Sequence, residues 1–380
     1  MQMDFHYYAT YCAAYLAGYS HEESQTIAYS AQFVDCCTRT LIANLHGPSS
    51  AATTQLQLEM MEARTDVVGL QDITRIWSSF HFLPYDLNAD VKKGGKSYKN
   101  KYRMLCAPNG ALVKDTVMLS KDFSLQAVGI AMHVLADTWA HSYFAGTPSF
   151  VLNNTGDDFV QINDDSEVRI QFIHNPASKD DYEKAVYTNS IRQVKENTIM
   201  NLGHGRAGHL PDYSFIRYKY MPAWGDYRVI VKDNPAEYYK AFAQMVYAMR
   251  FIRGEESDFC LDTYAYDVIA PYEERIRAII GKKQLIACED WAEFGYELSG
   301  QKVDDFDIAT YQKEYVDAAK DKKDDTFLGG FFNAAMRHKS MVTNKIFKSG
   351  NLLAGYSFDY NGKRLRGISD YFNLVKYSGK

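Results

Sequence analysis

The order of hydrophobic and polar residues along the chain predicts a mainly helical protein. The clearest stretch is residues 126–146, QAVGIAMHVLADTWAHSYFAG, an apolar run that is too long for a typical strand. Asp122 or Ser124 is placed to cap its start, and the Gly-Thr-Pro sequence that begins at Gly146 is placed to end it. Similar patterns predict further helices at residues 5–17, 20–44, 179–202, 234–254, 263–281, 284–299, 307–320, 326–340 and 366–376.

Local signals mark the starts of two of these helices. Ser20 is followed three residues later by Glu23, which is the pattern of a capping box. Asn234 precedes Pro235, so the sequence predicts an Asn cap with proline in the first turn.

Two stretches interrupt the helical pattern. Residues 86–120 contain the lysine-rich sequence KKGGKSYKNKYR and an Asn-Gly turn at Asn109, which predicts a solvated excursion. A patch that binds a phosphate-bearing substrate at the rim of a site is the alternative interpretation. Residues 149–180 alternate weakly between polar and apolar positions, which predicts a small β insertion.

The predicted fold class is therefore all-α, with a multi-helix core and a small β-like insertion. We expect residues 1–254 to form the core, with insertions at 86–120 and 149–180. We expect residues 255–380 to form a C-terminal helical extension that can pack on the same core.

Composition narrows the function classes only slightly. The chain has 380 residues and a net charge of −5, so it carries no global basic footprint for nucleic acid or an anionic membrane. No apolar run reaches the length of a membrane-spanning helix, and the N-terminal residues do not resemble a signal peptide. The six cysteines show no metal-binding or disulfide spacing, so we expect reduced thiols and a cytoplasmic protein.

The candidate chemistry begins on the long apolar helix. His133, Asp137 and His141 are four residues apart, so they lie on nearly one helical face, with a drift of about 40° per step. Polar groups on such a face need partners when they are buried. A divalent metal ion would satisfy all three side chains together, whereas the alternative is hydrogen bonding to neighbouring segments.

Other segments hold residues of the same kind. Asp35 lies among apolar residues and cysteines, and His81 lies between two phenylalanines. The glycine-rich stretch 202–212 contains two histidines and an aspartate. The complete set of candidate ligands is His6, Asp35, His81, His133, Asp137, His141, His204, His209 and Asp212.

All of these candidates offer nitrogen or oxygen and none offers a thiolate. Such a set suits Zn²⁺, and Mn²⁺ or Fe²⁺ would also fit. The number of candidates exceeds what one ion needs, so we expect two or three ions. Neighbouring metal ions are a common device for phosphoryl hydrolysis, because they activate water and hold both the attacking and the leaving oxygen.

In this order the residues resemble the zinc-dependent phospholipase C and fungal single-strand nuclease superfamily of all-α enzymes. The matching elements are an N-terminal His6, Asp35 on an early helix, His81-Phe82, and the HxxxD motif His133 to Asp137, followed by His141 and a Gly-His segment with Asp212. The match covers roughly residues 1–215 as scattered ligands. The sequence DTWAHSYFAG also resembles a DxxAHxxFxG pattern of a bacterial branch of this superfamily without a settled function.

The resemblance implies a role for each residue. Asp35, His81, His133 and Asp137 would hold one zinc ion, and Asp137 would bridge to a second ion at His6. His141, Asp212 and either His204 or His209 would hold a third ion. Asp35 and Asp137 are the implied catalytic residues, with Asp35 as a candidate base. The sequence departs from the family pattern in three ways: no tryptophan lies near the start, the spacing from Asp137 to His141 is short, and the last ligands lie in a glycine-rich segment.

The function expected from the sequence is a metal-dependent phosphodiester or phosphomonoester hydrolase. A phospholipid head group, a nucleotide and a nucleic acid all remain open as substrates. The alternative is an interaction protein without catalysis, in which a metal stabilises the fold and the C-terminal helices form the partner surface. An HD-type phosphohydrolase is disfavoured, because the chain has no adjacent His-Asp pair.

Overall fold

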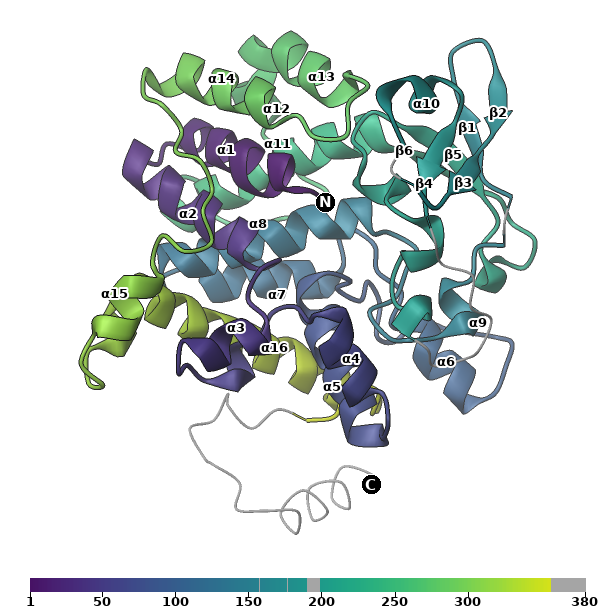
Figure 1. Cartoon of the computed structure of the whole chain (residues 1–380), viewed down its shortest axis with the longest axis horizontal. Coiled ribbons are helices and arrows are strands. Elements are labelled where there is room, and N and C mark those ends of the chain that lie inside the picture. Colours follow the sequence, from purple (N-terminus) through teal and green to yellow (C-terminus); the bar gives the residue numbers. More distant parts are fainter. Residues whose placement is uncertain (157, 176, 190–198, 357–380) are drawn as a thin grey trace.

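The computed structural model describes residues 1–380 except 157, 176, 190–198 and 357–380. Most described residues are helical, and two small sheets lie at one side of the molecule (Figure 1). The prediction of a mainly helical fold with a small β portion is therefore confirmed at this level. The predicted helix at 366–376 lies outside the described residues.

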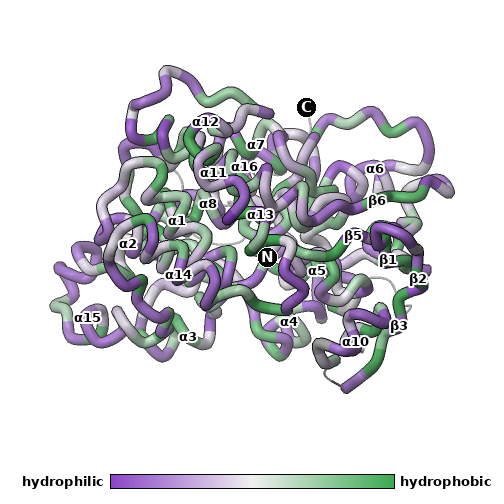
Figure 2. Tube along the Cα trace, turned by 90° about the horizontal axis from the view of Figure 1, so that it is seen from above, coloured by the Kyte–Doolittle hydropathy of each residue, from purple (hydrophilic) through white to green (hydrophobic). Residues whose placement is uncertain are grey.

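Helix α8 (Leu125–Ala140) runs through the centre of the core, and all but its first two residues are buried. Its neighbours in the core are α2 (His21–Phe33), α7 (Ala111–Ser120), α11 (Asn234–Arg253) and α16 (Phe327–Lys348). In Figure 2 the hydrophobic colour follows the inner helices around α8, and the polar colour is stronger on the outer loops. The apolar residues of α8 lie on every side of the helix, which fits its central position, because a helix that is apolar all round is usually buried all round.

The remaining helices cover this centre. The larger of two clusters of buried hydrophobic side chains includes residues from Met1 to Ala354, so the segment after residue 254 packs on the same cluster as helices before it, while a second, smaller cluster lies around the sheets. The other α-helices are α1 (Thr10–Leu16), α3 (Arg39–Asn44), α4 (Gln57–Ala63), α5 (Val67–Phe80), α6 (Lys96–Tyr102), α9 (Phe150–Asn153), α10 (Lys179–Glu183), α12 (Tyr266–Ile269), α13 (Glu273–Gly281), α14 (Cys288–Ser299) and α15 (Gln312–Asp317).

Side-chain caps explain several helix starts. Ser20 and Glu23 form the predicted capping box at the start of α2, and Ser124 caps α8 by accepting from the Ala127 amide. The predicted Asn cap of α11 is wrong, because Asp233 is the cap and accepts from the Ala236 amide. The side chain of Asn234 is buried instead, with consequences for the site described below.

The second predicted helix, at residues 20–44, is interrupted. Helix α2 ends at Phe33, and α3 begins only at Arg39, so Asp35 lies in the break between them. The break is held by Thr53, whose hydroxyl donates to the Val34 carbonyl and whose amide donates to the Cys37 carbonyl. Those carbonyls are therefore satisfied without a continuous helix.

The central helix also ends earlier than predicted. The last helical residue is Ala140, and His141 is the C-cap, whereas the sequence predicted an end at Gly146. A backbone pairing competes with the helix here: the amide of Tyr143 donates to Cys106, and the amide of Cys106 donates to Phe144. This pairing directs residues 141–145 away from the helix axis.

The β portion is larger than predicted. One antiparallel sheet has the order β2-β1-β5-β6, formed by β1 (Val160–Ile162), β2 (Glu167–Arg169), β5 (Arg217–Tyr220) and β6 (Ile230–Asp233). A second, parallel pair joins β3 (Gln171–Ile173) to β4 (Val186–Thr188). The predicted helix at 179–202 is therefore wrong after Glu183, because Val-Tyr-Thr at 186–188 favours a strand; part of that prediction, 190–198, lies outside the described residues.

The predicted excursion at 86–120 is only partly right. Residues 111–120 form α7, whose Leu112, Val113 and Val117 are buried in the core beside α8. The predicted turn forms at Pro108 and Asn109, with Asn109 at a φ of 63°, but it leads into α7, whose N-cap is Gly110, and not into a hairpin strand. The lysine-rich part forms the exposed end of the excursion and the short helix α6.

Two further predictions concern the surroundings of the chain. All six cysteines are free thiols, as expected. Among the described residues, no helix combines the length and hydrophobicity needed to cross a lipid bilayer.

Candidate metal centre

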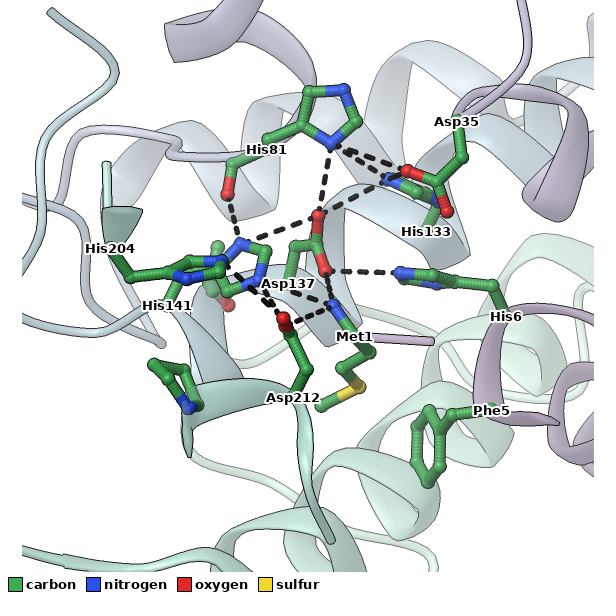
Figure 3. A network of polar contacts seen from close by, with 12 residues as sticks. Met1, Phe5, His6, Asp35, His81, His133, Asp137, His141, His204 and Asp212 are labelled. Carbon is green, nitrogen blue, oxygen red and sulfur yellow. Dashed lines mark hydrogen bonds and ion pairs between the residues drawn. The ribbon is translucent and has the colours of Figure 1, made fainter. Parts of the chain in front are cut away.

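The candidate ligands meet in one buried centre beside the end of α8 (Figure 3). Asp137 lies in the middle and is 1% exposed. Its Oδ2 lies 3.2 Å from His133 Nε2 and 3.3 Å from His81 Nδ1, and its Oδ1 lies 3.1 Å from His6 Nε2. One carboxylate from the central helix therefore faces one imidazole from its own helix and two from distant parts of the chain.

Local structure explains how each side chain reaches the centre. His6 lies in η1 (Asp4–Ala9), a π-helical turn, and wide turns of this kind occur often at functional sites. Asp35 lies in the break after α2, and His81 is the C-cap of α5. His141 is the C-cap of α8, so it directly follows the last helical residue, Ala140.

Backbone carbonyls determine the orientation of the histidine rings. His133 Nδ1 lies 2.9 Å from the Ala31 carbonyl, His81 Nε2 lies 3.0 Å from the Thr53 carbonyl, and His141 Nδ1 lies 2.7 Å from the His81 carbonyl. His204 Nδ1 lies 2.7 Å from the Gly208 carbonyl. Because a carbonyl can only accept, we assign an N–H to each of these ring nitrogens and a lone pair to the opposite nitrogen of each neutral ring.

These assignments bring lone pairs together. His133 Nε2 and His81 Nδ1 lie 3.3 Å apart, and Oδ1 of Asp35 lies 3.9 Å and 3.7 Å from them. Four acceptor groups, two imidazoles and two carboxylates, therefore converge in the same small space. Such a set is unfavourable without a cation, and histidine that donates one N–H to a carbonyl is the usual form of a metal ligand.

A further buried group also lacks a partner. Nδ1 of His6 makes no hydrogen bond, although the side chain is fully buried. The ring of His6 stacks on that of His133, with centroids 3.8 Å apart. Buried polar atoms without partners are rare in native proteins and point to a missing ion, water or function.

The third predicted ion needs His141, Asp212 and one of two histidines, His204 or His209. His141 Nε2 lies 3.1 Å from Asp212 Oδ1, and His204 Nε2 lies 3.6 Å from Asp212 Oδ2. His209 contacts Asp212 through Nδ1 at 3.0 Å, but its side chain is 63% exposed. The structure therefore places His204 within the group and His209 at its outer edge, where it hydrogen-bonds to Asp212.

The α-amino group of Met1 also lies in this centre. Its nitrogen is 2.7 Å from Asp137 Oδ1, 3.4 Å from Asp212 Oδ1 and 3.2 Å from His141 Nε2. Burial lowers the pKa of this amine, but the carboxylates of Asp137, Asp212 and Asp35 outweigh it and raise the pKa to about 10. The carboxylates thus hold a positive charge between them.

The protonation states also suit metal ligands, which must be neutral imidazoles and ionised carboxylates. Burial lowers the pKa of His6 to about 3 and that of His204 to about 4. Burial opposes ionisation of Asp137 and Asp212, yet the neighbouring histidines and the Met1 amine hold the pKa of both carboxyls well below its usual range.

Residues outside the predicted set hold the turn that carries Asp212. Asn234 Nδ2 donates to the carbonyls of Leu210 and Tyr213, each at 2.8 Å, and therefore ties the turn that carries Asp212 to the start of α11. The hydroxyl of Tyr238 donates to the Pro211 carbonyl at 3.1 Å. The sequence predicts Asn234 as a helix cap and gives no indication of this second role.

Two more buried side chains support the neighbouring backbone. Asn153 donates to the carbonyls of Ala145 and Asn201 at 3.1 Å and 2.8 Å, which joins the segment after His141 to the segment before His204. Lys232 is fully buried and donates to the Trp139 carbonyl at 2.8 Å, at the end of α8. An isolated Asn or Lys carries no sequence signal for such a role.

Among the described residues, three groups of side chains could each hold a metal ion. They are His6 with His133 and Asp137; Asp35 with His81 and His133; and His141 with His204 and Asp212. His133 has one free nitrogen, so the first two groups compete for it. The side chains thus supply two complete groups of three at a time, because His133 can complete only one of the first two groups.

The fold and site together define a mainly helical protein with a buried histidine and aspartate centre that could hold metal ions. The chain belongs to the Family of unknown function (DUF6765), whose model matches residues 1–346. No curated protein and no solved structure matches the chain. The matched region contains every residue of the centre.

Proposed function

We propose that the chain is a metal-dependent phosphoester hydrolase, with zinc as the first candidate metal. The observation that carries the proposal is that the possible ligand groups adjoin one another in a single centre around Asp137. Adjacent ions are suited to phosphoryl transfer, because they can bind oxygens on both sides of one phosphorus atom. A purely structural metal site needs only one closed set of four ligands.

The order of the ligands along the chain supports the same proposal. The resemblance to the zinc-dependent phospholipase C and single-strand nuclease superfamily implied that His6, Asp35, His81, His133, Asp137, His141 and Asp212 serve one site. The same side chains lie together in space, although they come from separate helices and turns. In this proposal His204 completes the third group, and His209 orients Asp212.

The donor set fits zinc, manganese or iron, since it contains imidazole and carboxylate without thiolate. When bound, such ions supply the positive charge that activates water and stabilises the phosphoryl group. The four histidines whose rings bond to backbone carbonyls would hold such ions, because those carbonyls fix the orientation of each ring.

The two carboxylates predicted to be catalytic have different surroundings. Asp137 is buried and contacts several ligands at once, so its role is to hold the centre together. Asp35 is 32% exposed and lies at the edge of the same group. Asp35 is therefore the carboxylate that can reach a substrate and accept a proton from an attacking water.

Hydrolysis of simple phosphoesters tests this function. We expect the metal-loaded protein to hydrolyse bis(4-nitrophenyl) phosphate or 4-nitrophenyl phosphate, and we expect Asp137→Asn to lose both metal and activity. Asp35→Asn should lose activity but keep the ion held by His141, His204 and Asp212, because Asp35 belongs to a different ligand group. His174→Ala is the matched control, because His174 is exposed and lies outside the centre.

The outcome also separates the two classes of function. Hydrolysis that survives in Asp35→Asn and Asp137→Asn would refute the proposed site. Full metal content without hydrolysis of either ester, and without binding of inorganic phosphate, would favour a metal-stabilised interaction protein.

A further inference from the structure

A cavity of about 800 Å³ adjoins the backbone segments that carry the metal centre. Tyr143 lines it two residues after His141, and Tyr85 lines it four residues after His81. Backbone bridges from Pro84 to Cys106 and from Leu105 to Ala145 join these segments. The cavity contains none of the candidate ligands and is a separate site.

Aromatic side chains form much of its wall. The ring of Trp224 stacks on that of Tyr143, with centroids 6.0 Å apart, and meets Tyr102 edge to face at 5.9 Å. The indole N–H of Trp224 also donates to the Tyr143 carbonyl at 3.2 Å. Tyr85 is 49% exposed. Fixed aromatic rings with accessible surface offer apolar platforms to a ligand.

Two carboxylates and one guanidinium line the same cavity and can form further hydrogen bonds. Within the described residues, the Oδ1 atom of Asp86 accepts from the Asn88 amide and Oδ2 has no partner, and Asp262 accepts from Asn109 and Tyr264 through Oδ1. Across the described portions of the chain, the guanidinium of Arg228 makes no side-chain hydrogen bond or ion pair. The wall therefore offers both acceptors and donors to a bound molecule.

Three residues that line the cavity have a left-handed backbone conformation. Asn109, Tyr143 and Asp262 have φ values of 63°, 76° and 58°, in the region that favours glycine. Asn and Asp adopt this region readily, but for Tyr143 it costs roughly 1–3 kcal/mol, and such positions occur often at binding sites. The buried side chain of Gln244 holds this arrangement by donating to Asn109 Oδ1 at 2.6 Å. The cavity is thus preorganised.

We infer that this cavity binds a neutral oligosaccharide. Sugar rings present apolar C–H faces to aromatic platforms, and their hydroxyls both donate and accept, which matches the mixture of Asp86, Asp262 and Arg228. Two carboxylates disfavour a polyanion, and the guanidinium disfavours an organic cation. The inference does not rest on the proposed hydrolase activity.

A neighbouring hollow favours a ligand longer than one sugar. This second hollow has a volume of about 340 Å³, shares Tyr85 and Asp86 with the cavity, and is also lined by Asn88, Asp115 and Lys345. A chain of sugar units can therefore extend from one hollow to the next past Tyr85. The binding determinants are Tyr85 as a platform and Asp86 as a hydroxyl acceptor.

Calorimetric titration of the full-length protein with pentasaccharides tests the inference. The probes are pentamers of β-1,4-glucose, α-1,4-glucose, β-1,4-xylose and β-1,4-N-acetylglucosamine, with tetramethylammonium as the organic-cation probe. We expect at least one sugar to bind with a Kd below about 1 mM, and both Tyr85→Ala and Asp86→Asn to weaken that binding about tenfold or more. The control is Tyr296→Ala, a 57% exposed tyrosine on α14 that lies outside both hollows.

Three results would overturn the inference. They are no binding of any pentasaccharide, sugar binding that is unchanged in both cavity variants, and binding of tetramethylammonium in preference to the sugars. Because both variants replace side chains at the surface of the hollow, circular dichroism should show them folded, and loss of binding then reports on the cavity itself.

Discussion

Gly129 allows a test of the metal centre that leaves all of its side chains in place. Gly129 lies on the side of α8 that packs on α2, and a Cβ at this position would lie 2.4 Å from the Ile27 carbonyl oxygen and 2.9 Å from the Ala31 amide nitrogen. Contacts under 3.0 Å are essentially never found for real Cβ atoms. Gly129→Ala must therefore push the backbone of α2 away from α8.

The size of this movement follows from the contact. Restoring ordinary van der Waals distance to the Ile27 carbonyl requires a shift of about 1 Å. Such a shift would break the 2.9 Å hydrogen bond from His133 Nδ1 to the Ala31 carbonyl, which lies one turn further along α2. We expect overpacking to cost about 1–3 kcal/mol of stability, and loss of the carbonyl partner to weaken metal binding about 10–100-fold.

Urea unfolding measures the first effect, and competition with a zinc chelator measures the second. Gly281→Ala is the matched control, because a Cβ there meets nothing within 4 Å. We expect this control to keep the stability and zinc affinity of the parent protein. Unchanged zinc affinity in a destabilised Gly129→Ala would show that the Ala31 carbonyl does not orient a metal ligand, and unchanged stability would refute the close packing of α2 on α8.

Three further predictions concern metal removal, the pH dependence of stability, and the substitution of Asn234. Removing metal with a chelator should lower the melting temperature, because a metal present at 100 times its Kd stabilises the fold by about 2.7 kcal/mol; a constant melting temperature would contradict metal binding. Burial lowers the pKa of His338 from 6.5 to about 4, so the unfolded chain binds more protons between these values and stability should fall by about 3 kcal/mol as pH falls from 6.5 to 4. Urea titrations at both pH values should show a smaller fall for His338→Gln, and an identical fall would refute this linkage. Asn234→Ala should lower the free energy of unfolding by about 1–3 kcal/mol, because two buried carbonyls lose their donor, and should weaken metal binding by the group that includes Asp212. Calorimetric unfolding with and without zinc measures both effects. A variant as stable as the parent would contradict this role of Asn234.

Hydrophobic periodicity predicts the central helix but not the residue at which it ends. Its apolar run and Ser124 cap were sufficient to predict α8, and the spacing from His133 to Asp137 predicted that both face one site. The end of the helix was not predictable in the same way. The pairing of Cys106 with Phe144 terminates it, and such a contact between distant segments leaves no periodic signal.

For Asp35 and Asp212, the sequence predicts which residues are candidate ligands but not how the fold positions them. Asp35 was recognised as an unusual carboxylate among apolar residues, but its position depends on Thr53, which holds the break after α2. For Asp212, the sequence left His204 and His209 as equal partners. Only the folded chain shows His204 inside the group and His209 exposed, because the hydrogen bond to the Gly208 carbonyl orients the His204 ring.

Strand β4 was missed for a physical reason as well. Charged residues at 179–184 have good helix-forming character, and α10 does form there. The next residues, Val186 to Thr188, pair with β3 in a parallel sheet, which is a contact set by tertiary structure.

X-ray diffraction from crystals of the purified protein, with anomalous data collected at the zinc edge, tests the central claim most directly. We expect at least two anomalous peaks, one beside His133 and Asp137 and one between His141, His204 and Asp212. An electron density map of zinc-supplemented crystals with the same side chains in place, and no anomalous peak among them, would contradict it.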